Sequence, residues 1–268
     1  MKRKLLLVLA IAMATVSTTT KVQAWGGVGH SAIAYIAEQN LTPEAKEKCY
    51  YYLQHTLPYY ASWMDYWRGV GVYRSVNNPH SMKASADGRT LDWGGKPAGR
   101  VMGHLENALK ELGDGKYKNL PDSVVRQRLI NMVHYIPDMH CPVHVGFPKD
   151  VYPHYRYTLR RNGKELKYHT FWDGSPAFTR KNWTFEKYAA EVDKVTPKQA
   201  KKWTKGTLDD WARDIIKQAH RSYKITPEGT DVAKMTEEQK QAVLELSDEM
   251  AMKAAYRLAY VLNTIFAK

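Results

Sequence analysis

The chain has 268 residues, of which 44% are hydrophobic, and its formal net charge at pH 7 is +13. This length allows one substantial buried core, and the two cysteines, Cys49 and Cys141, are too few for a disulfide framework. They can form one disulfide or remain two free thiols. The positive charge suits a polyanionic partner, but many exported proteins are simply basic, so charge alone does not decide the function.

The first 24 residues have the pattern of an export signal. A basic start, Lys2-Arg3-Lys4, precedes the apolar run Leu5–Ala14 and a polar stretch that ends in Val22-Gln23-Ala24. We expect cleavage after Ala24, release into the periplasm or the extracellular space, and Trp25 as the first residue of the mature protein. No stretch reaches the roughly 20 apolar residues of a membrane-spanning helix, so no stable membrane insertion is expected. No protein partner is predicted.

The rest of the chain is predicted to be one mainly α-helical domain, residues 25–268, without a linker or an internal repeat. Thr42-Pro43-Glu44 combines a capping residue, a proline at the first helical position and an acid in the first turn. Asp122 is expected to cap another helix, and Thr236 with Gln239 forms a capping box before the helix expected to be the longest. Further helices are expected near residues 29 to 39, 97 to 112 and 207 to 222.

One segment departs from the helical pattern. Between Tyr155 and Tyr168, aromatic and polar residues alternate around Asn162-Gly163, the strongest short signal for a β-hairpin. We therefore expect a small β-hairpin within the helical domain.

Two pairs of histidine and aspartate indicate a metal site. His134 precedes Asp138 by four residues, and His169 precedes Asp173 by the same distance. On a helix this spacing puts both side chains on one face, about one turn apart. A single pair is common as an ion pair or a buried hydrogen bond, whereas two pairs of imidazole and carboxylate donors favour zinc. The sequence has no zinc-finger, His-Glu-x-x-His or serine-triad pattern.

Four segments carry a more specific pattern: Trp25-Gly-Gly-Val-Gly-His30, Ala61-Ser-Trp-Met-Asp65-Tyr-Trp-Arg68, His134-Tyr-Ile-Pro-Asp138-Met-His140-Cys-Pro-Val-His144 and Tyr168-His169-Thr-Phe-Trp-Asp173. In order and spacing they resemble the motifs of the zinc-dependent single-strand nucleases, the S1/P1 family. The resemblance extends from Trp25 to about Asp173. It implies a mainly α-helical fold of the type also found in zinc-dependent phospholipases C, with three zinc ions.

The same resemblance implies nine metal ligands. One zinc would be held by Asp65, His80, His134 and Asp138, and a second by His144, His169 and Asp173. The third would be held by His30, by Asp138 as a bridge, and by Trp25 through its free α-amino nitrogen and carbonyl oxygen. His80 is placed by order and distance alone, because Ser81, Met82 and Lys83 after it do not match the family.

Asp65, Arg68 and Asp138 are the residues expected to act in catalysis, together with water activated by the metal ions. Arg68 would bind the phosphate, although a salt bridge to Asp65 is an alternative role. His140 would support the ligands without being one.

The resemblance implies a nuclease that cuts single-stranded DNA and RNA to 5'-phosphate products and acts as a 3'-nucleotidase. The family's nucleases usually carry an aromatic residue and an acid that bind the nucleobase, where this chain has Ser81, Met82 and Lys83. A phospholipase C-like phosphoesterase is therefore a second hypothesis. An inactive exported zinc-binding protein is a third, although all nine ligand positions are filled.

Overall fold

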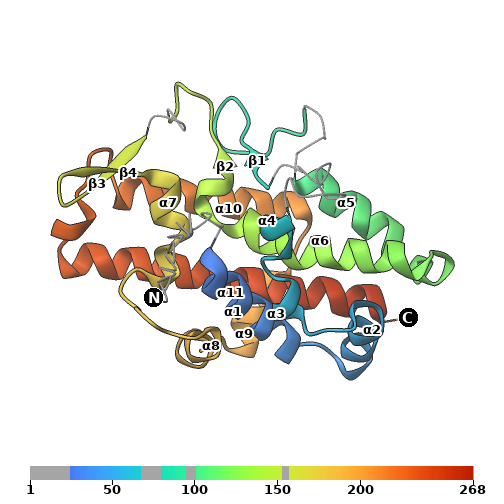
Figure 1. Cartoon of the computed structure of the whole chain (residues 1–268). Coiled ribbons are helices and arrows are strands. Elements are labelled where there is room, and N and C mark those ends of the chain that lie inside the picture. The colour runs from blue at the N-terminus through green and yellow to red at the C-terminus, as the bar shows by residue number, and fades with distance from the viewer. Residues whose placement is uncertain (1–24, 68–79, 95–100, 153–156, 268) are drawn as a thin grey trace, which may run out of the picture.

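The computed structural model describes residues 25–67, 80–94, 101–152 and 157–267 (Figure 1). Its α-helices are α1 (Gly26–Gln39), α2 (Pro43–Leu53), α3 (Leu57–Tyr60), α4 (Trp63–Trp67), α5 (Val101–Leu112), α6 (Asp122–His140), α7 (Tyr168–Asp173), α8 (Phe185–Val192), α9 (Pro197–Thr204), α10 (Leu208–Ile225) and α11 (Glu237–Phe266). The strands are β1 (Met82–Lys83), β2 (Val145–Gly146), β3 (Thr158–Arg161) and β4 (Lys164–Lys167). Short 3-10 turns are η2 (Lys116–Asn119), η3 (Pro142–His144), η4 (Ser175–Ala177) and η5 (Val232–Lys234). The mainly α-helical fold is confirmed.

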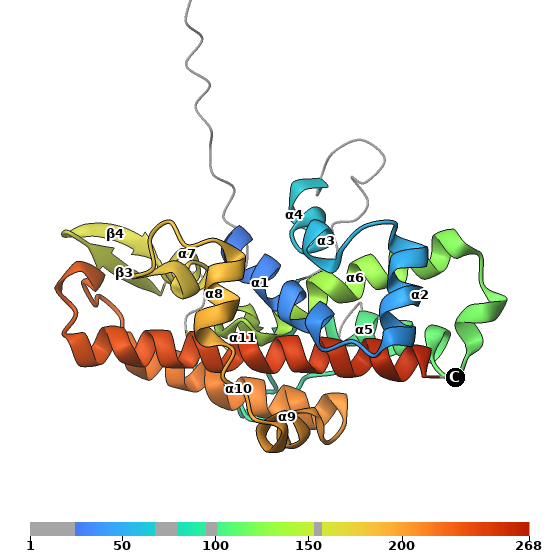
Figure 2. The ribbon, with the colours of Figure 1, turned by 90° about the horizontal axis from the view of Figure 1, so that it is seen from below.

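Helix α11 is the central support of the fold. It runs along the molecule in both views, with α10 and α9 beside it and α1, α2 and α6 packed against it (Figures 1 and 2). The apolar residues that recur at helical spacing along α11 are all buried: Val243, Leu246, Met250, Ala254, Leu258, Val261 and Ile265. These residues form one apolar stripe along α11, and a stripe of this length predicts that the helix organises the core. Across the described part of the chain, every helix is too short or too polar to cross a membrane.

The predicted helix starts are confirmed at two of three positions. The Thr42 side chain accepts a hydrogen bond from the Ala45 amide, and Thr236 with Gln239 forms a complete capping box. The prediction for Asp122 is wrong, because the capping position is Pro121 and Asp122 lies in the first turn. There its carboxylate accepts a hydrogen bond from the Tyr51 hydroxyl at 3.0 Å instead of capping the helix.

The hairpin forms where it was expected. Strands β3 and β4 are antiparallel, with Arg161 opposite Lys164. Asn162 and Gly163 both have positive φ angles, 52° and 79°, as a two-residue hairpin turn of this hand requires. A second pairing was not predicted: β1 and β2 are parallel, with Met82 opposite Val145. It joins two segments that are far apart in the sequence.

Truncation of the α11 stripe should destabilise the protein strongly. Leu258 has no exposed surface, so Leu258→Ala removes buried methyl groups and leaves a cavity, at a cost of about 2–5 kcal/mol in the free energy of unfolding. Thr264→Ala is the matched control, because Thr264 is exposed on the same helix and should cost about 0.5 kcal/mol or less. Urea unfolding of both variants measures the difference, and similar losses would contradict the central role of this stripe.

Candidate metal centre

The centre is built around the C-terminal half of α6. His134 and Asp138 lie one turn apart on this helix and are both 0% exposed. The His134 Nδ1–H donates to the Ala61 carbonyl at 2.8 Å, which fixes the ring and leaves Nε2 facing Asp138 Oδ2 at 3.1 Å. A metal-binding histidine usually has its second nitrogen anchored in this way.

Two residues from other segments converge on this pair. His80 precedes β1, and its Nδ1 lies 2.8 Å from Asp138 Oδ2 and 2.9 Å from His134 Nε2. Asp65, on α4, places Oδ1 3.7 Å from both histidine nitrogens. In a tetrahedral zinc site with bonds of about 2.0–2.1 Å, neighbouring ligand atoms are about 3.3–3.4 Å apart. The observed separations lie on both sides of this value, so the four donors fit one ion.

His30 faces the other carboxylate oxygen of Asp138. It lies on α1, has no exposed surface, and places Nε2 3.2 Å from Asp138 Oδ1. Its ring stacks on that of His134 with 4.8 Å between the centroids. The two oxygens of Asp138 therefore face different histidines, which is the arrangement that a bridging carboxylate needs.

Trp25 lies beside the same end of α6. It is 1% exposed, and its indole N–H donates to the Pro137 carbonyl at 2.7 Å. The start of the expected mature chain is therefore held next to Asp138.

A second group of donors lies beyond the end of α6. His144 follows the helix in η3, and its Nδ1–H donates to the His80 carbonyl at 2.9 Å, so Nε2 is left for other partners. This Nε2 is 3.7 Å from Asp173 Oδ1, and His169 Nε2 is 2.9 Å from Asp173 Oδ2. The pairing of β1 with β2 is what brings the His80 and His144 segments together.

Buried polar atoms in both groups are without hydrogen-bond partners in the described part of the chain. They are His30 Nδ1 and Nε2, Asp65 Oδ2, His80 Nε2, Asp138 Oδ1 and Asp173 Oδ2. The contacts of 3.2 Å at Asp138 Oδ1 and 2.9 Å at Asp173 Oδ2 are close but lack hydrogen-bond geometry. Unpaired buried polar atoms are costly, and metal ions would satisfy them. The donor set therefore fits the metal cluster that the sequence predicts.

His140 faces away from the centre. Its Nδ1–H donates to the Ile136 carbonyl, and its Nε2 accepts a hydrogen bond from Arg257 at 2.8 Å, which defines a neutral ring. Burial and the Arg257 charge hold the pKa of His140 well below its usual range. Arg257 also bonds Asp214 at 3.0 Å, so His140 ties the end of α6 to α10 and α11.

The sequence did not predict Cys141 as part of the centre, and the role predicted for Arg68 stays a prediction. Cys141 belongs to a group with His144 and Asp173 that can hold a metal ion. Its position between His140 and His144 was the signal that could have found it. Both cysteines are free, buried thiols. Arg68 lies outside the described residues.

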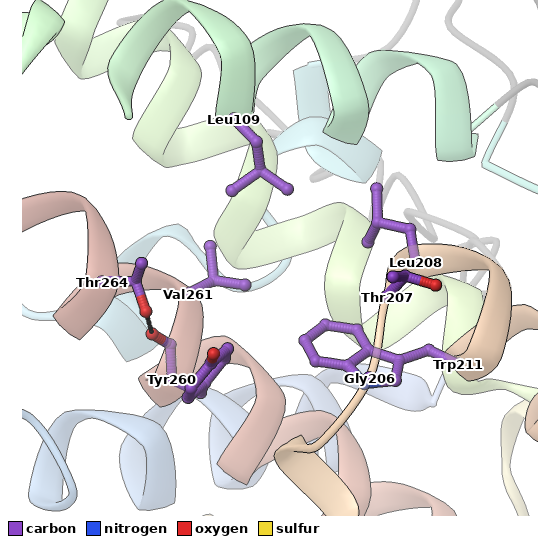
Figure 3. A pocket seen from close by; sticks show the side chains of 8 residues that line it. All are labelled: Leu109, Gly206, Thr207, Leu208, Trp211, Tyr260, Val261 and Thr264. Atoms are coloured by element: carbon purple, nitrogen blue, oxygen red, sulfur yellow. Dashed lines mark hydrogen bonds between the residues drawn. The ribbon is translucent and has the colours of Figure 1, made fainter. Parts of the chain in front are cut away.

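An apolar pocket of about 220 Å³ lies elsewhere, between α5, α10 and α11 (Figure 3). It is lined by Leu109, Gly206, Thr207, Leu208, Trp211, Tyr260, Val261 and Thr264. None of these is a histidine, cysteine or carboxylate, and the Thr264 hydroxyl is bonded to the Tyr260 carbonyl. The pocket therefore has none of the chemistry of the metal centre.

Fold and site together define a helical protein with a buried cluster of histidines and aspartates of the kind found in metallohydrolases. The sequence matches the family S1/P1 Nuclease over residues 25–267, and the chain belongs to this family. It is thus a phosphoesterase hydrolase of the nuclease type, from a family that is in general zinc-dependent. No curated protein matches the chain.

The metal-free centre should titrate above neutral pH. Burial alone would lower the pKa of His134, but the Asp138 and Asp65 carboxylates and the Ala61 carbonyl raise it to about 9. A raised folded-state pKa means that this contribution to stability is present below about pH 6.5 and is lost as the pH rises through about 9. NMR titration of the His134 ring in the metal-free protein measures this.

In the metal-free Asp138→Asn variant, the pKa of His134 should fall because the nearest negative charge is removed while burial persists. Zinc should abolish the titration in the wild-type protein, because the metal replaces the proton. A pKa of His134 below 6.5 in the metal-free wild-type protein would contradict the arrangement of charges described here.

Proposed function

We propose that the protein is an exported, zinc-dependent nuclease that hydrolyses single-stranded DNA and RNA to 5'-phosphate products and has 3'-nucleotidase activity. The observation that carries this proposal is the convergence of His30, His80 and His134 on the buried Asp138 carboxylate, in a chain that belongs to a nuclease family. A site that only stored metal would not need one buried carboxylate between two sets of donors.

Three zinc ions are proposed, held as the family motifs imply. The first ion takes Asp65, His80, His134 and Asp138, the second takes His144, His169 and Asp173, and the third takes His30, Asp138 and the amino and carbonyl groups of Trp25. When bound, zinc supplies Lewis-acid activation of water and of phosphate oxygens near neutral pH.

The residues around the ions have roles of their own. Burial lowers the pKa of His144, which favours the neutral ring that a metal requires. Asp138 is fully buried, whereas the His169 side chain is 47% exposed, so substrate would approach beside His169. Arg68 is proposed to bind the phosphate with its fork of donors. No protein nucleophile is needed.

The segment Ser81 to Lys83, after His80, has no aromatic side chain on which a nucleobase could stack. Met82 has no exposed surface, and Lys83 forms an ion pair with Asp92 at 2.8 Å, so Ser81 to Lys83 provide no stacking ring. This favours a phospholipid head group as the second candidate substrate.

Export is proposed because the family match begins at Trp25, directly after the expected cleavage point. The mature protein would then be periplasmic or secreted.

Removal of metal should abolish activity on single-stranded nucleic acid. After treatment with a chelator, the rate should fall to that of a control without enzyme, and zinc should restore it, because no side chain replaces the metal-activated water. The same preparation should be assayed on single-stranded DNA, RNA, 3'-nucleotides and phosphatidylcholine. Cleavage of phosphatidylcholine without cleavage of nucleic acid would overturn the nuclease assignment in favour of a phospholipase C-like one.

A residue added before Trp25 should disable the third zinc site. A free α-amino group has an unperturbed pKa of about 7.7–8.0, so zinc can displace its proton, whereas a peptide nitrogen is a poor ligand. A protein with one extra alanine before Trp25 should therefore bind less zinc and react more slowly than one that starts at Trp25. The control carries the extra alanine after Lys268. Equal zinc content and equal rates in all three proteins would exclude the amino-terminal ligand.

A further inference from the structure

Cys141 lies inside the metal centre, although the nine proposed ligands do not include it. It is the first residue after α6, it is 0% exposed, and its sulfur lies 3.5 Å from Asp173 Oδ1. Cys49, the other cysteine, is buried in the core on α2 and belongs to no group of metal donors among the described residues. The two thiols therefore have different surroundings.

Two other donors with available lone pairs lie close to the sulfur. The ligand atoms of Cys141, His144 and Asp173 all lie within 4.8 Å of one another. His144 uses Nδ1 for the His80 carbonyl, so Nε2 is the atom left for a metal. Asp173 is 1% exposed, and its Oδ2 has no hydrogen bond, although His169 Nε2 is 2.9 Å away. A buried carboxylate oxygen in this state points to a cation.

We infer that Cys141 is a further protein ligand, as a thiolate, to the metal ion held by His144, His169 and Asp173. On binding, the S–H bond breaks, its proton passes to water, and a sulfur–metal bond takes its place. The inference rests on the proposed metal centre and deepens it. Four protein donors fit a tetrahedral zinc site, and such a site can expand to five ligands, so substrate could still reach this ion beside the exposed His169 side chain.

Cobalt(II) substitution tests the inference directly, because sulfur bound to cobalt gives a charge-transfer absorption band in the near ultraviolet. We would prepare the wild-type protein, Cys49→Ser and Cys141→Ser, all starting at Trp25, and measure cobalt per chain and the absorption spectrum. The wild-type protein and Cys49→Ser should show the band, and Cys141→Ser should lose it. Cys141→Ser should also release cobalt to a chelator faster than Cys49→Ser.

Two outcomes would overturn the inference: a fully loaded wild-type protein without the band, or a band that survives in Cys141→Ser. If Cys141→Ser does not fold, Cys49→Ser still decides the question, because Cys141 is then the only cysteine left. Cadmium-113 NMR of the wild-type protein gives a second reading, since sulfur ligation shifts the resonance far downfield of sites with only nitrogen and oxygen donors.

The same proteins, loaded with zinc, should be assayed on single-stranded DNA. A charge-transfer band in the cobalt-loaded protein, with no hydrolysis by the zinc-loaded protein, would overturn the proposed nuclease function and leave the thiolate ligand in place. Hydrolysis without the band would overturn the thiolate ligand and leave the nuclease function in place.

Discussion

The carboxylate of Asp138 is fully buried, and the rest of the centre is arranged around the cost of burying that charge. An ionised carboxyl group inside a protein needs nearby positive charge, hydrogen bonds or a metal ion. Burial alone would raise the pKa of Asp138, but the charge of His134 and the hydrogen bonds that the carboxylate receives hold it well below its usual range. Histidines from α1, α6 and the segment before β1 therefore meet at this one side chain. Their convergence makes a site for cations, and the nuclease family to which the chain belongs supports phosphoester hydrolysis there.

The scaffold holds this convergence through interactions on the far side of α6. His140 accepts a hydrogen bond from Arg257 on α11, and Arg257 also bonds the Trp203 carbonyl at 2.9 Å. On the near side, the Trp25 indole bonds the Pro137 carbonyl, which the last turn of α6 leaves free because the Cys141 amide bonds Asp138 instead. The end of α6 is thus fixed from both sides, which is what precise placement of Asp138 requires.

Two features beside the ligands bear on chemistry. As a metal ligand, Cys141 would add a soft sulfur donor next to hard oxygen and nitrogen donors, and such a donor favours zinc over magnesium or calcium. Ser81 to Lys83 stand where the family's nucleases usually have an aromatic residue and an acid. Both features lie in segments next to ligands, so they would affect substrate and metal preference without disturbing the helical core.

The sequence by itself determined the helices of 11 or more residues, the hairpin and the two histidine–aspartate pairs, because these depend on residues close together in the chain. The Thr236 capping box, the α11 stripe and Asn162-Gly163 act over a few residues, and each is found where it was predicted. The start of α6 was one residue off, since Pro121 and not Asp122 takes the capping position. The family resemblance implied that His30, His80 and His134 meet at Asp138, and only the tertiary structure shows the contacts that bring them there. The sequence placed His80 by order and distance alone, and the parallel pairing of β1 with β2 lies next to it. The roles of Cys141 and Arg257 could not be read from spacing, because the contacts of these side chains cross from one helix or loop to another and depend on how those segments pack.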